Sequence, residues 1–190
     1  QTTDSVGTGR NWPLYGAATA TALSQGICRT AMPFVLTAIG GTETHVGYAL
    51  AGNSLAYMAA LVFAGSLLGH LDVRWATRLA TTVALIAAVM MVAAVFGSGR
   101  QDDFDGRAWI WMIIAAGGCG GAAMALFWPF LMSWVSARYE GVELNRQLGR
   151  YNGSWSSGGL IGPVIGAWLV EQNPIWPMVA AVVCFVTSLA

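Results

Sequence analysis

The sequence predicts an all-α integral membrane protein whose fold is a six-helix transmembrane bundle. Apolar residues make up 56% of the chain and charged residues only 9%, and the mean hydropathy is +0.59. A soluble domain carries about a quarter charged residues, so this composition is typical of a chain in lipid. The apolar residues form six segments without period-two alternation, and the first five reach the roughly 20 residues that a helix needs to cross hydrocarbon.

Short polar connections separate the six segments and lie on alternate sides of the membrane. The segments cover residues 12–39, 46–69, 76–96, 108–135, 151–170 and 174–190. We expect two parts in the chain: a polar cytoplasmic N-terminal tail over residues 1–11 and a six-helix transmembrane domain over residues 12–190. The sixth segment is short because the chain ends within it. We therefore expect a truncated last helix and a fragment of a longer protein.

The chain contains no lysine, and the distribution of its arginines predicts the orientation of the bundle. Cytoplasmic loops are enriched in basic residues. A cytoplasmic N-terminus places most of the arginines inside, and we expect this orientation in a bacterial inner membrane. The inner set is Arg10, Arg74, Arg78, Arg138, Arg146 and Arg150, and the outer set is Arg100 and Arg107.

The third and sixth segments differ from the other four in their lack of polar side chains. Residues 81–96 and 178–189 are almost uniformly apolar, whereas each of the other segments carries a polar or glycine-rich stripe. A helix that is apolar on all sides can face lipid over most of its surface. The pattern predicts that the third and sixth helices are peripheral and that the other four are central.

Several classes of function are disfavoured by composition. The formal net charge is zero, which gives no basic surface for nucleic acid. Cysteine and histidine occur without metal-ligand spacing, so we expect no metal and no cofactor. We also expect no enzyme, because neither a Gly-x-Ser-x-Gly motif nor an intramembrane aspartate pair is present.

Arg29 is the sharpest functional candidate, because it lies well inside the first segment. Placing an arginine at the centre of a bilayer costs at least about 2.5 kcal/mol. Thr21, Gln25 and Arg29 are spaced four residues apart and predict one polar stripe along a cavity wall. Arg29 then meets a substrate anion or a carboxylate elsewhere in the protein. The alternative is that its side chain extends toward the interface or bonds to carbonyl groups near Pro33.

Other polar and aromatic side chains are candidates for contacts with a substrate. Asn53 and Tyr57 lie four apart on the second segment, and Asn152 and Ser156 do so on the fifth. Hydrogen bonds between helices are the alternative role for these residues. Trp128 precedes a proline in the fourth segment, where it either stacks on a substrate or fills a helix kink.

Small residues repeat every four positions in the fifth segment, at Gly158, Gly162 and Gly166. Such a face lets a neighbouring helix backbone approach closely, and Pro163 removes one helical hydrogen bond within it. The combination suits a helix that packs tightly and bends as the protein changes shape.

The loop between the second and third segments contains Asp72, Arg74 and Arg78. Asp72 lies at a helix end, where an ion pair with either arginine could hold one conformation. A solvated loop carboxylate is the equal alternative.

Two of these motifs carry a resemblance to a known family. The run from Gly158 to Ala167 resembles the fifth-helix signature G-x-x-x-G-P-x-x-G-G of the major facilitator superfamily, with Ala167 at the last glycine. The loop of residues 69–78 is similar to the cytoplasmic signature G-x-L-a-D-r-x-G-r-r/k, although its Gly–Asp spacing is one residue shorter. The six-segment pattern and its order also agree with the N-terminal half of such a transporter.

The resemblance implies one half of a twelve-helix fold, built as a 3+3 inverted repeat with outer third and sixth helices. The partners that it implies are the lipid bilayer, a missing C-terminal six-helix half and a small-molecule substrate bound between the halves. It further implies a secondary active transporter that works by alternating access, as an exporter or antiporter. A non-transporting scaffold or a pigment- or cofactor-delivery protein on the same fold is the alternative.

Overall fold

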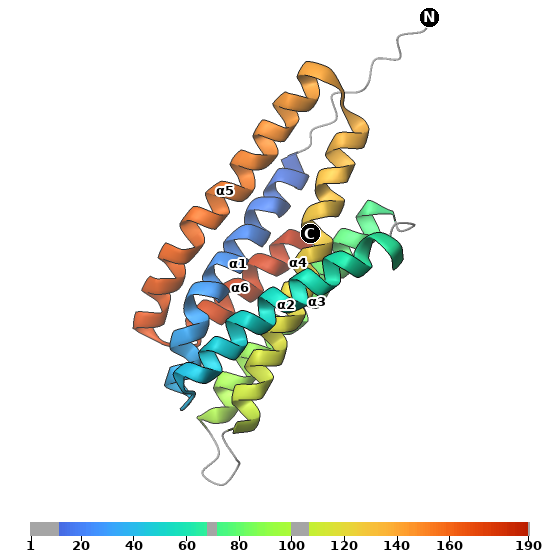
Figure 1. The fold of residues 1–190 in the computed structure, drawn as a ribbon. Helices are drawn as coiled ribbons and strands as arrows, with labels where there is room; N and C mark the ends of the chain where they lie inside the picture. The colour runs from blue at the N-terminus through green and yellow to red at the C-terminus, as the bar shows by residue number, and fades with distance from the viewer. Residues whose placement is uncertain (1–11, 68–71, 100–106, 190) are drawn as a thin grey trace, which may run out of the picture.

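The computed structural model describes residues 12–67, 72–99 and 107–189 (Figure 1). These residues form six α-helices and no strand, as the sequence predicts. The helices are α1 (Trp12–Ala38), α2 (Glu43–Leu67), α3 (Val73–Ser98), α4 (Arg107–Arg138), α5 (Gly141–Gln172) and α6 (Trp176–Leu189). The expected tail, the loop residues 69–71, Arg10 and Arg100 lie outside the described residues.

Helix α5 begins at Gly141, ten residues before the predicted start of the fifth segment. The additional turns are polar, so hydropathy does not mark them. They are held by tertiary contact: Gln147 is buried and accepts a hydrogen bond from the Tyr15 hydroxyl of α1. Its amide donates to Glu143 at 2.6 Å, which is a pair on one helix face.

The helices pack in a pattern that relates the first three to the last three. Helix α1 packs mainly on α5 and α6, α4 packs mainly on α2 and α3, and α3 packs on α6. Exchanging α1, α2 and α3 for α4, α5 and α6 leaves this set of contacts unchanged. Because three spans bring a chain to the opposite side of a membrane, the two triplets have opposite directions, as in an inverted repeat.

The glycine face of α5 packs directly on the backbone of α1. A Cβ placed on Gly158 would lie 2.5 Å from the carbonyl oxygen of Thr19, and one on Gly162 would lie 2.7 Å from that of Leu23. Gly166 approaches the backbone of Ile27 in the same way. The predicted stripe of small residues therefore lies within the described bundle, at the interface of α1 and α5.

Glycines on α4 make the same kind of close backbone contact at the symmetry-related interface with α2. A Cβ on Gly121 would clash with the backbone of Asn53, whose side-chain amide donates to the Gly117 carbonyl oxygen at 2.7 Å. Each of the two inner helices therefore packs on a flanking helix by backbone contact: α1 packs on α5, and α4 packs on α2. Close packing of small residues is a major source of helix association in lipid.

Two apolar clusters fill the bundle at different depths. The first cluster contains Met32, Leu36, Met91, Ile113 and Met178 with smaller neighbours, and it lies toward the end of the bundle where α1 joins α2. The other lies toward the opposite end and contains residues that include Tyr15, Ala84, Met124, Phe127 and Phe185.

The central and peripheral positions differ in part from the expectation. Helices α1 and α4 are central, and α3 and α6 have exposed apolar faces as expected. Helices α2 and α5 instead flank the described bundle (Figure 1), and their outer faces expose large apolar side chains that include Leu55, Val62, Leu160 and Val164. Asn53 of α2 packs on α4, and Gly158, Gly162 and Gly166 of α5 pack on α1.

Three of the six helices are long and apolar enough to cross a membrane by length and composition, namely α2, α3 and α4. Helices α1 and α5, with 27 and 32 residues, are long enough but contain more polar residues. Helix α6 is apolar and has 14 described residues. The polar residues of α1 include Gln25 and Arg29, which line cavities in the bundle.

Candidate functional site

Arg29 lies in the second half of α1, nine residues before the helix ends at Ala38. At about 1.5 Å per residue, this places it roughly 14 Å from that end, near mid-depth along the bundle axis. Its side chain is exposed and lines two cavities on opposite sides of the polar face of α1. Gln25 and Thr30 also line both cavities.

No carboxylate accompanies Arg29 among the described residues that line these cavities. Acidic side chains in the described ranges lie at helix ends: Glu43, Asp72, Glu140, Glu143 and Glu171. The ion pair recorded among them joins Glu143 to Arg146 near the start of α5, at 3.9 Å. The positive charge of Arg29 is therefore not neutralised by an acidic group within the described bundle.

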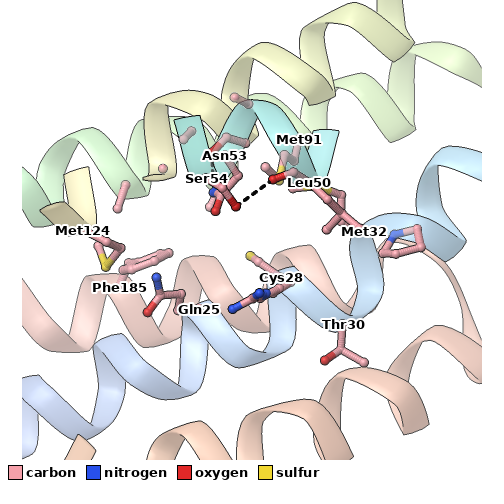
Figure 2. Close-up of a pocket in the computed structure, with 18 residues that line it drawn as sticks. Gln25, Cys28, Thr30, Met32, Leu50, Asn53, Ser54, Met91, Met124 and Phe185 are labelled. Carbon is pink, nitrogen blue, oxygen red and sulfur yellow. Dashed lines mark hydrogen bonds between the residues drawn. The ribbon is translucent and has the colours of Figure 1, made fainter. Parts of the chain in front are cut away.

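The first cavity has a volume of about 340 Å³ and lies between α1, α2, α3 and α4, with Phe185 of α6 also lining it (Figure 2). Figure 2 shows Gln25 and Cys28 pointing from α1 into this space, opposite Asn53 and Ser54 of α2. Alanines and glycines of α3 and α4 form much of the remaining wall. The cavity is narrow, with small residues and few hydrogen-bonding groups.

The second cavity has a volume of about 520 Å³ and lies between α1, α2, α4 and α5. Four aromatic side chains line it, Tyr57, Trp128, Tyr151 and Trp155. The Trp128 ring centroid lies 6.4 Å from that of Tyr151 and 6.2 Å from that of Trp155. Aromatic rings from three helices therefore converge beside Arg29.

The structure brings most of the predicted polar residues to these cavities. Asn53 lines the first cavity, whereas Tyr57, Trp128 and Asn152 line the second. Ser156 is exposed and lines neither. Residues four apart on a helix differ by about 40° in direction, which turns Ser156 further from α1 than Asn152.

Thr21 does not extend the polar stripe of Gln25 and Arg29. It is fully buried, and its hydroxyl lies 2.9 Å from the hydroxyl of Ser188 on α6. Two steps of four residues turn the helix face by about 80°, so Thr21 faces α6 while Arg29 faces the cavities. Ser24 is also directed at α6 and donates to the Ala181 carbonyl oxygen at 3.3 Å.

Asp72 is positioned as the N-cap of α3. Its carboxylate accepts a hydrogen bond from the Arg74 backbone amide at 3.4 Å. No ion pair with the Arg74 or Arg78 side chain is recorded, and all three residues are exposed. A carboxylate at this position accepts a hydrogen bond from a helical N–H group that has no partner within the helix. It also interacts favourably with the positive end of the helix dipole.

Tyr151 and Trp155 were not among the residues selected from the sequence. The signal was present, because the two aromatic residues lie four apart on the fifth segment and on the same side as Asn152 and Gly159. Pro163, selected for its effect on the backbone, also lines the second cavity, and its ring packs on Gly26 of α1. The glycine face and the cavity wall are thus adjacent surfaces of α5.

Two triplets of helices beside two cavities, with an arginine that no described carboxylate neutralises, are typical of a membrane transport protein rather than of a simple membrane anchor. A family model described as Major Facilitator Superfamily matches residues 14–190. The chain therefore belongs to the major facilitator superfamily, a family of membrane transporters for small molecules, and forms a six-helix half of its fold. A comparison with curated proteins found no match.

Proposed function

We propose that this protein is a secondary active transporter that moves a small solute with an anionic group across the membrane by alternating access. The observation that carries the proposal is Arg29, which lines two cavities in the bundle interior with no described carboxylate beside it. An anion at this position would offset part of the cost of a positive charge in lipid. The amide of Gln25, which lines the same two cavities, adds a hydrogen-bond donor.

The proposal places the substrate between this six-helix half and a second half of the transporter. Arg29 supports this arrangement, because its side chain is exposed although it lies near mid-depth of the bundle and lines both cavities. A second half packed there would close the cavity and rock against the first. Pro163, which lines the cavity and packs on α1, would bend α5 during this motion.

An isolated six-helix half is expected to associate with itself, since the face that carries Arg29 and the two cavities loses its partner. Residues 1–190 can be purified in detergent and compared with the full-length protein by size-exclusion chromatography. Oligomers or aggregates of the half, beside a monodisperse full-length protein, are expected. A monodisperse, protease-resistant half would contradict the proposed position of the second half.

We further propose export by antiport, which the fifth-helix motif of residues 158–167 supports. The coupling ion can be identified with full-length protein in liposomes, by measuring uptake and counterflow of organic anions, sugars and lipophilic drugs with and without a pH gradient. Counterflow of an anion, changed by the pH gradient, supports proton-coupled antiport. Absence of movement for every solute under every gradient would contradict transport and favour a scaffold or delivery protein.

A further inference from the structure

The aromatic lining of the second cavity distinguishes it from the first. Tyr57, Trp128, Tyr151 and Trp155 come from α2, α4 and α5, and all four line the space beside Arg29. The first cavity contains one aromatic residue, Phe185, among walls rich in alanine and methionine. It is also the smaller of the two, about 340 Å³ against about 520 Å³. A ring-containing solute therefore fits the second cavity better.

Aromatic clusters of this kind bind either cations or other rings. A cation is attracted to the face of an aromatic ring, which is the basis of cages for quaternary ammonium groups. Arg29, however, brings a positive charge to the same wall, and no acidic residue among the described lining residues neutralises it. Repulsion by Arg29 thus opposes a cation, whereas stacking on an uncharged ring remains favourable.

Several polar groups of this cavity can donate hydrogen bonds. The indole Nε1 of Trp155 donates to the Asn152 side-chain oxygen at 3.1 Å, and an indole nitrogen can only donate. The Asn152 oxygen is therefore engaged, and its amide nitrogen is left to donate. One turn apart on α1, the guanidinium of Arg29 and the side-chain amide of Gln25 offer hydrogen bonds to a group that only accepts. A carboxylate or sulfonate is such a group.

We propose that the solute is an aromatic anion, with its acidic group at Arg29 and Gln25 and its ring against Trp128 and Trp155. This inference rests on the proposed function and adds a substrate class to it. The cavity volume of about 520 Å³ lies within the range of roughly 300–1,000 Å³ that small-molecule sites occupy. The ring supplies the apolar contact, and the acidic group supplies the negative charge that pairs with Arg29.

Equilibrium binding to the full-length protein tests this inference with three probes of similar size: phenylacetate, cyclohexylacetate and 2-phenylethylamine. Phenylacetate is expected to bind roughly two- to tenfold more tightly than cyclohexylacetate, the range that an aromatic contact gives. The amine is expected not to bind. Trp155→Leu should abolish the preference for the aromatic acid, and Trp155→Phe should retain it.

Trp168→Leu is the matched control, because Trp168 is also an exposed tryptophan of α5 and lines neither cavity. It should leave the ratio of the two acid affinities unchanged. Equal affinities for the two acids, a preference for the amine, binding of neither acid or a Trp155→Leu ratio equal to wild type would each overturn the inference. If both acids bind equally and Arg29→Gln weakens both, the aromatic preference fails while the proposed anion transport stands.

Discussion

Among the individual residues, Arg29 determines the chemistry of the site. A charged side chain at mid-depth costs at least about 2.5 kcal/mol in lipid, and within the described bundle no acidic side chain compensates for it. Its exposure to two cavities allows water or a solute to contact the guanidinium. The second cavity also presents Asn152 and four rings, so that charge, donors and stacking surfaces lie within one space.

Asn53 lines a cavity, but its hydrogen bond to the Gly117 carbonyl oxygen indicates a role in holding α2 on α4. Asn53→Ala should lower the free energy of unfolding by about 0.6–2 kcal/mol, the range for hydrogen bonds between membrane helices. Thermal unfolding of the full-length protein in detergent measures this loss. Ser54→Ala is the control, because the Ser54 hydroxyl bonds to the Leu50 carbonyl oxygen within its own helix. Unchanged stability of Asn53→Ala with a weakened affinity for substrate would indicate a binding residue instead.

Among the secondary-structure elements, backbone contact joins the helices in pairs. Gly162 and Gly26 place α5 against α1, and Gly121 places α4 against α2. Polar side chains reinforce the first pair, since the Thr19 hydroxyl donates to the Ser154 carbonyl oxygen at 3.1 Å. Each pair has little room for sliding, so the conformational change is expected to move helix pairs as units.

Gly162→Ala tests this packing. The added Cβ would lie 2.7 Å from the Leu23 carbonyl oxygen and 3.0 Å from the Gly26 Cα, both backbone atoms that cannot turn aside. The helices must separate, at an expected cost of about 1–3 kcal/mol in the free energy of unfolding. Thermal unfolding in detergent checks the loss, and Gly153→Ala on the same helix is the control because nothing lies within 4 Å of its Cβ. Equal stability of the two variants would contradict the close contact.

The elements were largely predictable, because membrane helices are marked by long apolar segments. The start of α5 was not, since residues 141–150 are polar and their position depends on the contact of Gln147 with Tyr15. The glycine stripe was predictable as a packing surface from its spacing. Its partner α1 could not be identified, because spacing on one helix does not specify which neighbour it meets.

The candidate site was predictable only in part, for a similar reason. Arg29 and Gln25 are marked by their polarity within an apolar segment, and both line the cavities. Thr21 has the same four-residue spacing but faces α6. The convergence of Trp128, Trp155 and the two tyrosines depends on how three helices pack, which periodicity within one segment does not encode.

At the scale of the whole molecule, helices α1–α3 and α4–α6 form two triplets whose contact pattern is unchanged when they are exchanged. This symmetric packing beside the cavities favours motion between two states. The described half leaves Arg29 exposed where it lines both cavities. Under the alternating access proposed above, the end at which this space is open would change. The ends are defined by charge: Arg74, Arg138 and Arg146 lie at one end of the bundle, and Arg107 lies at the other.

This charge distribution predicts the orientation of the bundle. Val142→Cys, at the start of α5, should react with a membrane-impermeant maleimide only after cells are opened, whereas Thr44→Cys, at the start of α2, should react in intact cells. Both positions are exposed. The native cysteines at 28, 119 and 184 are replaced by serine in this background. The reverse labelling pattern would contradict a cytoplasmic N-terminus.

Transport by the Arg29→Ala variant of the full-length protein tests the central claim most directly. Counterflow of an anion in liposomes should be lost by at least about tenfold in Arg29→Ala, while the variant elutes as a folded protein. Arg150→Ala should transport as wild type does, because Arg150 is exposed near the start of α5 and lines neither cavity. Wild-type counterflow in Arg29→Ala would contradict the account and make Arg29 a structural residue.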